Sequence, residues 1–227
     1  MGMRYVIFRI YYFVKNKIGL QKKTFPTNPD FKKYISLKKW KNNLPPFFFY
    51  GKTIKGLKKQ PSEDLKHNLE DLKSGIYTFF NKSKINLGVD YDWVTNPQTN
   101  HKYDINKHWS EIQDFSADAG DIKFVWEKAR FSFLYDIIRY DYHFKEDQSR
   151  YVFDQIENFI DNNPINQGPN YKCSQEISLR VLNWVFALYY YKDSKCLTEK
   201  LFAKIMHTIY WQIHHVYNNI NFSRICV

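Results

Sequence analysis

Residues 166–184 read NQGPNYKCSQEISLRVLNW, and this stretch organises the rest of the chain. It begins with Gly168-Pro169, a pair typical of a turn, and continues as an apolar segment with helical spacing. Glu176 and Arg180 stand four residues apart, so a helix places both on one face, where they can pair. Because this helix is apolar enough to be buried, the two charges must be paired or must serve a site.

The composition is that of a folded and strongly basic protein. Of the 227 residues, 44% are hydrophobic and 19% aromatic, which is enough to build a core. Aromatic side chains in this number can line a cleft that stacks on sugar rings, although packing between helices is their ordinary role. The net charge of +11 suits an anionic partner: nucleic acid, a membrane surface or an acidic polysaccharide.

The positive charge is concentrated near the N-terminus. Residues 1–59 contain 15 Lys or Arg and one acidic residue, Asp30, whereas residues 60–227 contain 19 basic and 22 acidic residues. We therefore divide the chain into a basic, aromatic-rich N-terminal arm or subdomain over residues 1–60 and a helical domain over residues 61–227. The first segment, MGMRYVIFRIYYFVKNK, either packs on the rest of the chain or contacts a membrane surface as a basic amphipathic segment.

Nothing in the sequence predicts a metal or a cofactor. The three cysteines, Cys173, Cys196 and Cys226, are widely spaced, and the seven histidines include no HExxH pattern. No window reaches the roughly 18 apolar residues that a membrane span requires. No recognition motif accompanies the basic charge, so we expect no specific nucleic-acid partner.

Apolar spacing predicts a mainly helical chain with a few short strands. A helix opens at Ser62, with acidic residues in its first turn, and is expected to reach Phe80. Residues 85–104 alternate loosely and contain turn signals, so short strands and a hairpin-like loop are expected there. From Gly120 onward the pattern is helical, and the similar helix lengths predict stacked antiparallel hairpins. Residues 47–50 (FFFY) are expected to form a short buried strand or a hydrophobic plug.

Three blocks of sequence resemble a known family. DWVTNPQTNHKYDINKHWSEI, GDIKFVWEKARF and NNPINQGPNYKCSQEISLRVLNW occur in the order and rough spacing of the heparinase II/III-like polysaccharide lyases. The resemblance covers roughly residues 88–184. It implies a partial (α/α) toroid of antiparallel helical hairpins, a toroid that in the family is followed by a β-sandwich. The sandwich is absent here, and two hairpins are too few to bury the inner faces of such an array, so we expect a longer protein.

The resemblance also implies a chemistry. These lyases remove the C5 proton of a uronic acid, and an amide that holds the neighbouring carboxylate stabilises the developing enolate. Asn170 matches the position of that amide, although an Asn after Gly-Pro before a helix is also an ordinary N-cap. The Tyr and His that act as base and acid would come from later parts of such a protein.

The neighbours of Asn170 receive roles by the same resemblance. Tyr171 would place an aromatic ring at the cleft, whereas Glu176 and Arg180 would orient the loop or contact the substrate. Arg130, in the WExxR block, would be scaffold or a substrate contact. The implied function is the N-terminal part of a lyase that cleaves a uronic-acid-containing acidic polysaccharide, inactive as this fragment. The alternative is a non-catalytic glycan-binding or surface-polysaccharide assembly protein on the same toroid.

Overall fold

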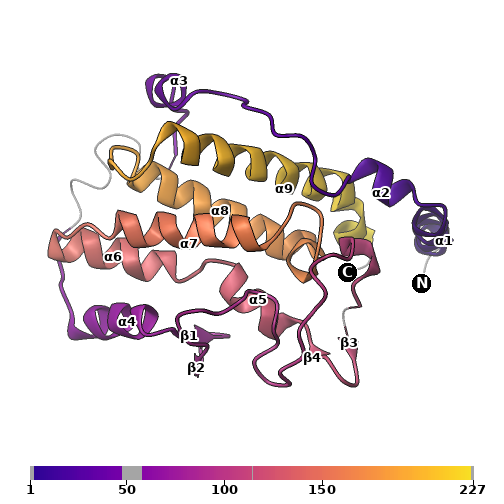
Figure 1. The fold of residues 1–227 in the computed structure, drawn as a ribbon, viewed down its shortest axis with the longest axis horizontal. Helices are drawn as coiled ribbons and strands as arrows, with labels where there is room; N and C mark the ends of the chain where they lie inside the picture. Colours follow the sequence, from indigo (N-terminus) through magenta and orange to yellow (C-terminus); the bar gives the residue numbers. More distant parts are fainter. Residues whose placement is uncertain (1–2, 48–57, 114, 226–227) are drawn as a thin grey trace.

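Helices form most of the protein. The computed structural model describes residues 3–47, 58–113 and 115–225. Helix accounts for 55% of residues and strand for 7%, so the predicted mainly α class is confirmed. The strands form two small antiparallel pairs, which lie below the long helices in the view of Figure 1. A toroid is not seen among the described helices.

The longer helices of the protein lie side by side in a layer, and a shorter helix covers its lower side in the view of Figure 1. The layer contains α6 (Leu134–Phe144), α7 (Ser149–Asn162), α8 (Ser174–Tyr190) and α9 (Glu199–Ile225), with α4 (Glu63–Lys73) packed on α6. The largest core cluster lies between these helices. It includes the fully buried side chains of Ile137, Phe153, Ile156, Trp184 and Phe202.

Helix α4 begins as predicted but ends earlier than predicted. Ser62 caps its N-terminus by accepting a hydrogen bond from the backbone N–H of Leu65 at 3.4 Å. The expected continuation to Phe80 is wrong, because Gly75 takes a left-handed conformation with φ +81° and turns the chain. The residues that follow form strand β1 (Ile76–Phe79), paired antiparallel with β2 (Ser83–Asn86).

Of the short strands and hairpin-like loop expected within residues 85–104, the hairpin-like loop is confirmed, because the backbone N–H of Asn96 donates to the carbonyl of His101 at 2.8 Å and that of Tyr103 to the carbonyl of Val94 at 3.1 Å. Beyond the end of β2, this region contributes one isolated pairing, between Thr95 and Lys102. Side chains also hold the loop, since the amide of Asn96 donates to the carbonyl oxygens of Ala119 and Asp121 at 2.8 and 3.0 Å. The second strand pair consists of β3 (Phe115–Ser116) and β4 (Gly120–Asp121).

The continuous helix expected after Gly120 is interrupted. Helix α5 (Lys123–Ala129) ends before Phe131, which has φ +61°, and α6 starts afterwards. A left-handed backbone is costly for a bulky residue, so packing must compensate. Phe131 is fully buried, and its ring stacks on Trp93 with 5.3 Å between ring centroids. This aromatic packing accounts for the break.

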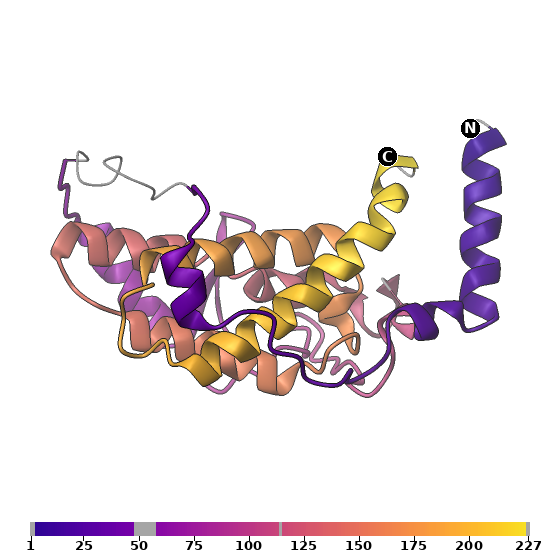
Figure 2. The same ribbon diagram turned by 90° about the horizontal axis from the view of Figure 1, so that it is seen from above.

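The N-terminal segment consists of a protruding helix and an extended stretch of chain that follows it. Helices α1 (Met3–Lys17) and α2 (Leu20–Thr24) extend beyond one end of α9, and the chain then runs along α9 to α3 (Leu37–Asn42) (Figures 1 and 2). Trp40 of α3 joins the main core cluster. The domain boundary near residue 60 stays a prediction, and residues 48–50 of the FFFY run lie outside the described residues.

Candidate functional site

The loop before α8 is fixed by hydrogen bonds to distant parts of the chain. The amide of Asn166 donates to the carbonyl oxygen of Pro26 at 2.8 Å. The backbone N–H of Gly168 donates to the carbonyl of Lys107 at 2.9 Å, and Gly168 itself has φ +69°. Since these contacts cross between segments far apart in sequence, the loop has a defined position relative to the helices.

Asn170 lies in this loop and does not cap α8. It belongs to a short 3-10 helix, Pro169–Tyr171, and the N-cap of α8 is Cys173, so the capping interpretation is wrong. The buried amide of Asn170 donates to the carbonyl of Trp93 at 2.9 Å and to Oδ1 of Asn163 at 2.8 Å. Both amide hydrogens are therefore used inside the protein, while Oδ1 meets no donor among the described residues.

Arg180 is buried beneath this loop. Its Nη2 donates to the carbonyl oxygen of Asn170 at 2.5 Å, and its guanidinium carbon lies 4.6 Å from the ring centroid of Phe159. Within the described part of the chain, Nε and Nη1 have no acceptor. Burial lowers the pKa of Arg180 to about 10, because the charged form has lost its hydration.

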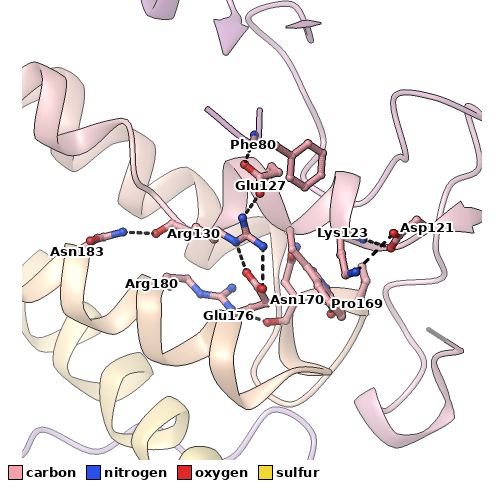
Figure 3. Close-up of polar contacts among 11 residues, drawn as sticks. Phe80, Asp121, Lys123, Glu127, Arg130, Pro169, Asn170, Glu176, Arg180 and Asn183 are labelled. Carbon is pink, nitrogen blue, oxygen red and sulfur yellow. Dashed lines mark hydrogen bonds and ion pairs between the residues drawn. The ribbon is translucent and has the colours of Figure 1, made fainter. Parts of the chain in front are cut away.

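Glu176 pairs with Arg130 and not with Arg180, the partner that the four-residue spacing suggested. Its carboxylate is bound by Arg130 at the end of α5, with Nη2 of Arg130 at 2.9 Å from Oε1 and Nε bonded to Oε2 (Figure 3). Nη1 of Arg130 binds Glu127 from the same helix. One guanidinium thus joins two carboxylates, whereas Arg180 turns to a backbone carbonyl.

Further hydrogen bonds tie this ionic cluster of Glu127, Arg130 and Glu176 to its surroundings. The other carboxylate oxygen of Glu127 accepts from the backbone N–H of Phe80 at 3.0 Å (Figure 3). The amide of Asn183 on α8 donates to the carbonyl of Arg130 at 2.7 Å. The cluster therefore links α5, α8 and the end of β1.

Trp126 connects the second sequence block with the third. Its indole Nε1 donates to the carbonyl oxygen of Pro169 at 2.9 Å, in a buried position. The three sequence blocks are thus in direct contact: the second and third through Trp126 and through Arg130 with Glu176, and the first and third through Asn170 with Trp93.

Tyr171 faces the interior of the protein. It packs in a buried cluster with Phe25, Trp109 and Ile177, and its hydroxyl has no hydrogen-bond partner among the described residues. Burial raises the pKa of its hydroxyl. The substrate-binding role of Tyr171 stays a prediction, and it would require the loop to open.

A cavity of about 420 Å³ lies on the other side of the ionic cluster. Its walls come from α4, β1 and the α5–α6 segment, and they include Asn68, Thr78, Phe80, Lys128 and Arg130. Of the five residues predicted from sequence, only Arg130 is among the described lining residues. The structure therefore separates the buried loop around Asn170 from the accessible space next to Arg130.

Lys128 is the cavity residue that sequence reasoning missed. Its side chain is 4% exposed, and Nζ lies 4.0 Å from the ring centroid of Trp93, 4.8 Å from Tyr77 and 5.2 Å from Tyr91. Burial lowers the pKa of Lys128 to about 8. No sequence signal identifies this lysine, because the rings that surround it come from β1 and from the loop after β2.

His108 and Trp109 anchor the loop that precedes the second strand pair. Both are buried, and Nε2 of His108 lies 2.9 Å from the carbonyl oxygen of Phe25. The ring of His215 on α9 meets Trp109 edge to face, with 4.6 Å between centroids. Burial lowers the pKa of His215 to about 3, so this histidine is neutral near pH 7.

Three further observations concern metal binding, membrane spans and similarity to known proteins. Among the described residues, no group of three or more His, Cys, Asp or Glu side chains is arranged to hold a metal ion. Within the same residues, no helix is long and apolar enough to cross a membrane. Comparison with protein families, curated proteins and solved structures found no match. The class that the structure itself defines is a mainly helical protein with a buried ionic cluster beside a ligand-sized cavity.

Proposed function

We propose that this chain is the N-terminal helical part of a polysaccharide lyase that binds a uronic-acid-containing polysaccharide and cleaves it by β-elimination. The observation that supports the proposal most is the contact between the three sequence blocks. Trp126 donates a hydrogen bond to Pro169, Arg130 pairs with Glu176, and the amide of Asn170 donates to the carbonyl of Trp93. In this proposal the helical hairpins are the first ones of a partial (α/α) toroid.

The cavity is suited to a sugar. Its volume of about 420 Å³ falls in the range of roughly 300–1,000 Å³ that small-ligand sites occupy. Phe80 offers an aromatic surface, Asn68 and Thr78 offer polar groups, and Lys128 supplies a cation at the wall. A uronate would use the rings for stacking and the cation for its carboxylate.

The catalytic part of the proposal concerns Asn170. Its amide would hold the substrate carboxylate in place of its present acceptors, Trp93 and Asn163, so the loop must open before substrate can reach it. Arg180, next to Asn170, would add a positive charge that stabilises the enolate. The base and acid would be supplied from outside this chain.

Binding is tested with acidic and neutral oligosaccharides. Isothermal calorimetry would compare alginate-derived and heparin-derived oligosaccharides with neutral dextran oligosaccharides of equal length. We expect acidic chains to bind, and Phe80→Ala to weaken binding about tenfold, equivalent to about 1.4 kcal/mol. Val89→Ala serves as control, because Val89 is exposed and lies outside the cavity. Equal binding of dextran, or no effect of Phe80→Ala, would contradict this site.

A second function has one specific observation in its favour. Because Asn170 is buried and both of its amide hydrogens are already donated, the same protein could bind glycans, or take part in surface-polysaccharide assembly, without cleaving them. Unsaturated uronate products absorb ultraviolet light, so an absorbance assay on the bound oligosaccharides separates the two functions. Product formation that is lost in Asn170→Ala supports the lyase. Binding without product from either this chain or a longer form supports the alternative.

A further inference from the structure

Helix α1 stands apart from the helical body. Figure 2 shows it projecting beside the end of α9, joined to the rest of the protein through α2. None of its residues, from Met3 to Lys17, is buried. Only one face of this 15-residue helix is partly buried, where Tyr12 packs against the cluster that contains Phe25 and Trp109, so the outward face must be explained by another environment.

The outward face of α1 is apolar. Met3, Ile7, Ile10 and Val14 are 76%, 61%, 59% and 46% exposed, and their spacing of four, three and four residues places them on one line along the helix. Exposed apolar side chains widen this stripe on both sides, namely Val6, Tyr11 and Phe13. The opposite face carries Tyr5, Phe8 and Tyr12, which are half-buried. Soluble proteins rarely leave such a continuous apolar surface in water.

Basic residues border this stripe. At about 3.6 residues per turn, Arg4 and Lys15 lie along one edge and Arg9 along the other. Lys17 continues the positive charge at the C-terminal end of the helix. Residues 1–59 as a whole contain 15 basic residues and one acidic residue, so the surroundings of α1 share its charge.

We propose that α1 lies on the surface of an anionic lipid bilayer, with its apolar stripe at the boundary between headgroups and acyl chains and its arginines and lysines at lipid phosphates. This combination of an apolar face and a cationic border is typical of interfacial helices. The charge favours lipid over a second copy of this chain, because two copies would bring two strongly basic arms together.

The helix rests on the bilayer and does not cross it. Fifteen residues span about 22 Å as a helix, which is shorter than a hydrocarbon core of about 30 Å. The attachment to α2 passes through Gly19, whose φ of +75° turns the chain between the two helices. A bound α1 would hold the helical body next to the lipid surface, independently of what the cavity binds.

Vesicle flotation tests the proposal with the whole chain. We expect binding to vesicles of phosphatidylcholine with phosphatidylglycerol, weaker binding to phosphatidylcholine alone, and weaker binding in high salt. The variant Ile7→Gln with Ile10→Gln removes apolar surface at constant charge and should lower the partition coefficient by about tenfold or more. Its matched control is Val89→Gln with Tyr217→Gln, which changes two exposed side chains outside α1 and should bind like the unaltered protein.

Two outcomes would overturn the proposal. One is binding to anionic vesicles that Ile7→Gln with Ile10→Gln leaves unchanged, since the stripe would then have no part in it. The other is no vesicle binding together with a dimer that the same variant dissociates in sedimentation velocity, which would assign the stripe to a second copy. Because every substituted side chain is exposed, circular dichroism should show an intact helical body in every variant.

Discussion

Arg130 at the end of α5 donates two hydrogen bonds from its guanidinium to the carboxylate of Glu176 on α8, and its Nη2 lies 2.9 Å from Oε1. The third nitrogen binds Glu127, so one cation serves two carboxylates whose side chains are each only 8% exposed. Arg130 is 20% exposed and borders the cavity. The ionic cluster therefore joins α5 to α8 and also forms part of the cavity wall.

Removing the arginine should destabilise the protein strongly. Arg130→Met leaves two nearly buried carboxylates without a counter-charge, and we expect the free energy of unfolding to fall by about 3–5 kcal/mol. Urea unfolding followed by tryptophan fluorescence measures this loss. Arg139→Met is the control, because Arg139 forms an exposed ion pair with Asp136 and should cost less than about 1 kcal/mol.

A combined variant separates charge from packing in that cluster. Adding Glu127→Gln and Glu176→Gln to Arg130→Met removes the uncompensated charges, so most of the lost stability should return. If the triple variant is as unstable as Arg130→Met alone, the loss arises from packing around Arg130 and the electrostatic explanation is wrong.

Lys128 should reduce stability near neutral pH. Its pKa of about 8 in the folded protein is below its ordinary value of 10.5, so the charged form is disfavoured by folding. Lys128→Met should therefore raise the free energy of unfolding at pH 7 by about 1–2 kcal/mol, with the three ring contacts offsetting part of the gain. The difference should shrink as pH rises from 8 to 10.5, where the unfolded lysine also becomes neutral. A variant that is less stable at pH 7 would show that the ring contacts outweigh desolvation.

The turn after α4 requires glycine at position 75 for two reasons. Its backbone is left-handed, and a side chain there would have no space. A Cβ on Gly75 would lie 2.3 Å from the carbonyl carbon and oxygen of Gly88, a backbone neighbour that cannot rotate away. A Cβ on Gly88 would meet nothing within 4 Å, although its φ of +75° resembles the +81° of Gly75. Gly88→Ala should cost about 1 kcal/mol from strain alone, and Gly75→Ala on the order of 3 kcal/mol. Equal losses in thermal unfolding would show that the predicted clash is relieved.

Much of the helical architecture could be predicted from periodicity and caps. The expected start of α4 agrees with the structure, because Ser62 and the acidic first turn are local signals. The end of α4 carried a signal that could have been used, since Gly75 precedes a run rich in β-branched and aromatic residues. The break at Phe131 had none, because its left-handed backbone is stabilised by Trp93, Phe159 and Trp184 from elsewhere in the chain.

For the candidate site, too, the sequence predicted only part of the contacts. Spacing correctly placed Glu176 and Arg180 on one helix, but their true partners are Arg130 and the carbonyl of Asn170. A choice between a partner four residues away and one 46 residues away depends on helix packing, which sequence spacing does not contain. The burial of Lys128 and its lowered pKa depend on rings from other parts of the chain, so this residue could not be identified before the fold was known.

Buried His215 should make the protein sensitive to mild acid. Its ring packs against Trp109 and Phe25, and burial, together with the positive charges of His108 and Arg180, lowers its pKa to about 3. Because 6.5 is its ordinary value, the unfolded chain binds the proton first as pH falls from 6.5 towards 3. The stability that depends on neutral His215 is complete above pH 6.5 and decreases below it, by about 1.4 kcal/mol per pH unit at most.

The test compares pH dependence and not stability at one pH. Between pH 7 and pH 5 the unaltered protein should lose about 2 kcal/mol through this residue, and His215→Phe should lose correspondingly less, whatever its stability at pH 7. His67→Gln is the control, because His67 is exposed on α4 and should leave the slope unchanged. His108 is also buried with a lowered pKa and contributes with the same sign. An unchanged slope in His215→Phe would therefore assign the acid sensitivity to His108, and a His108→Gln variant would then flatten it.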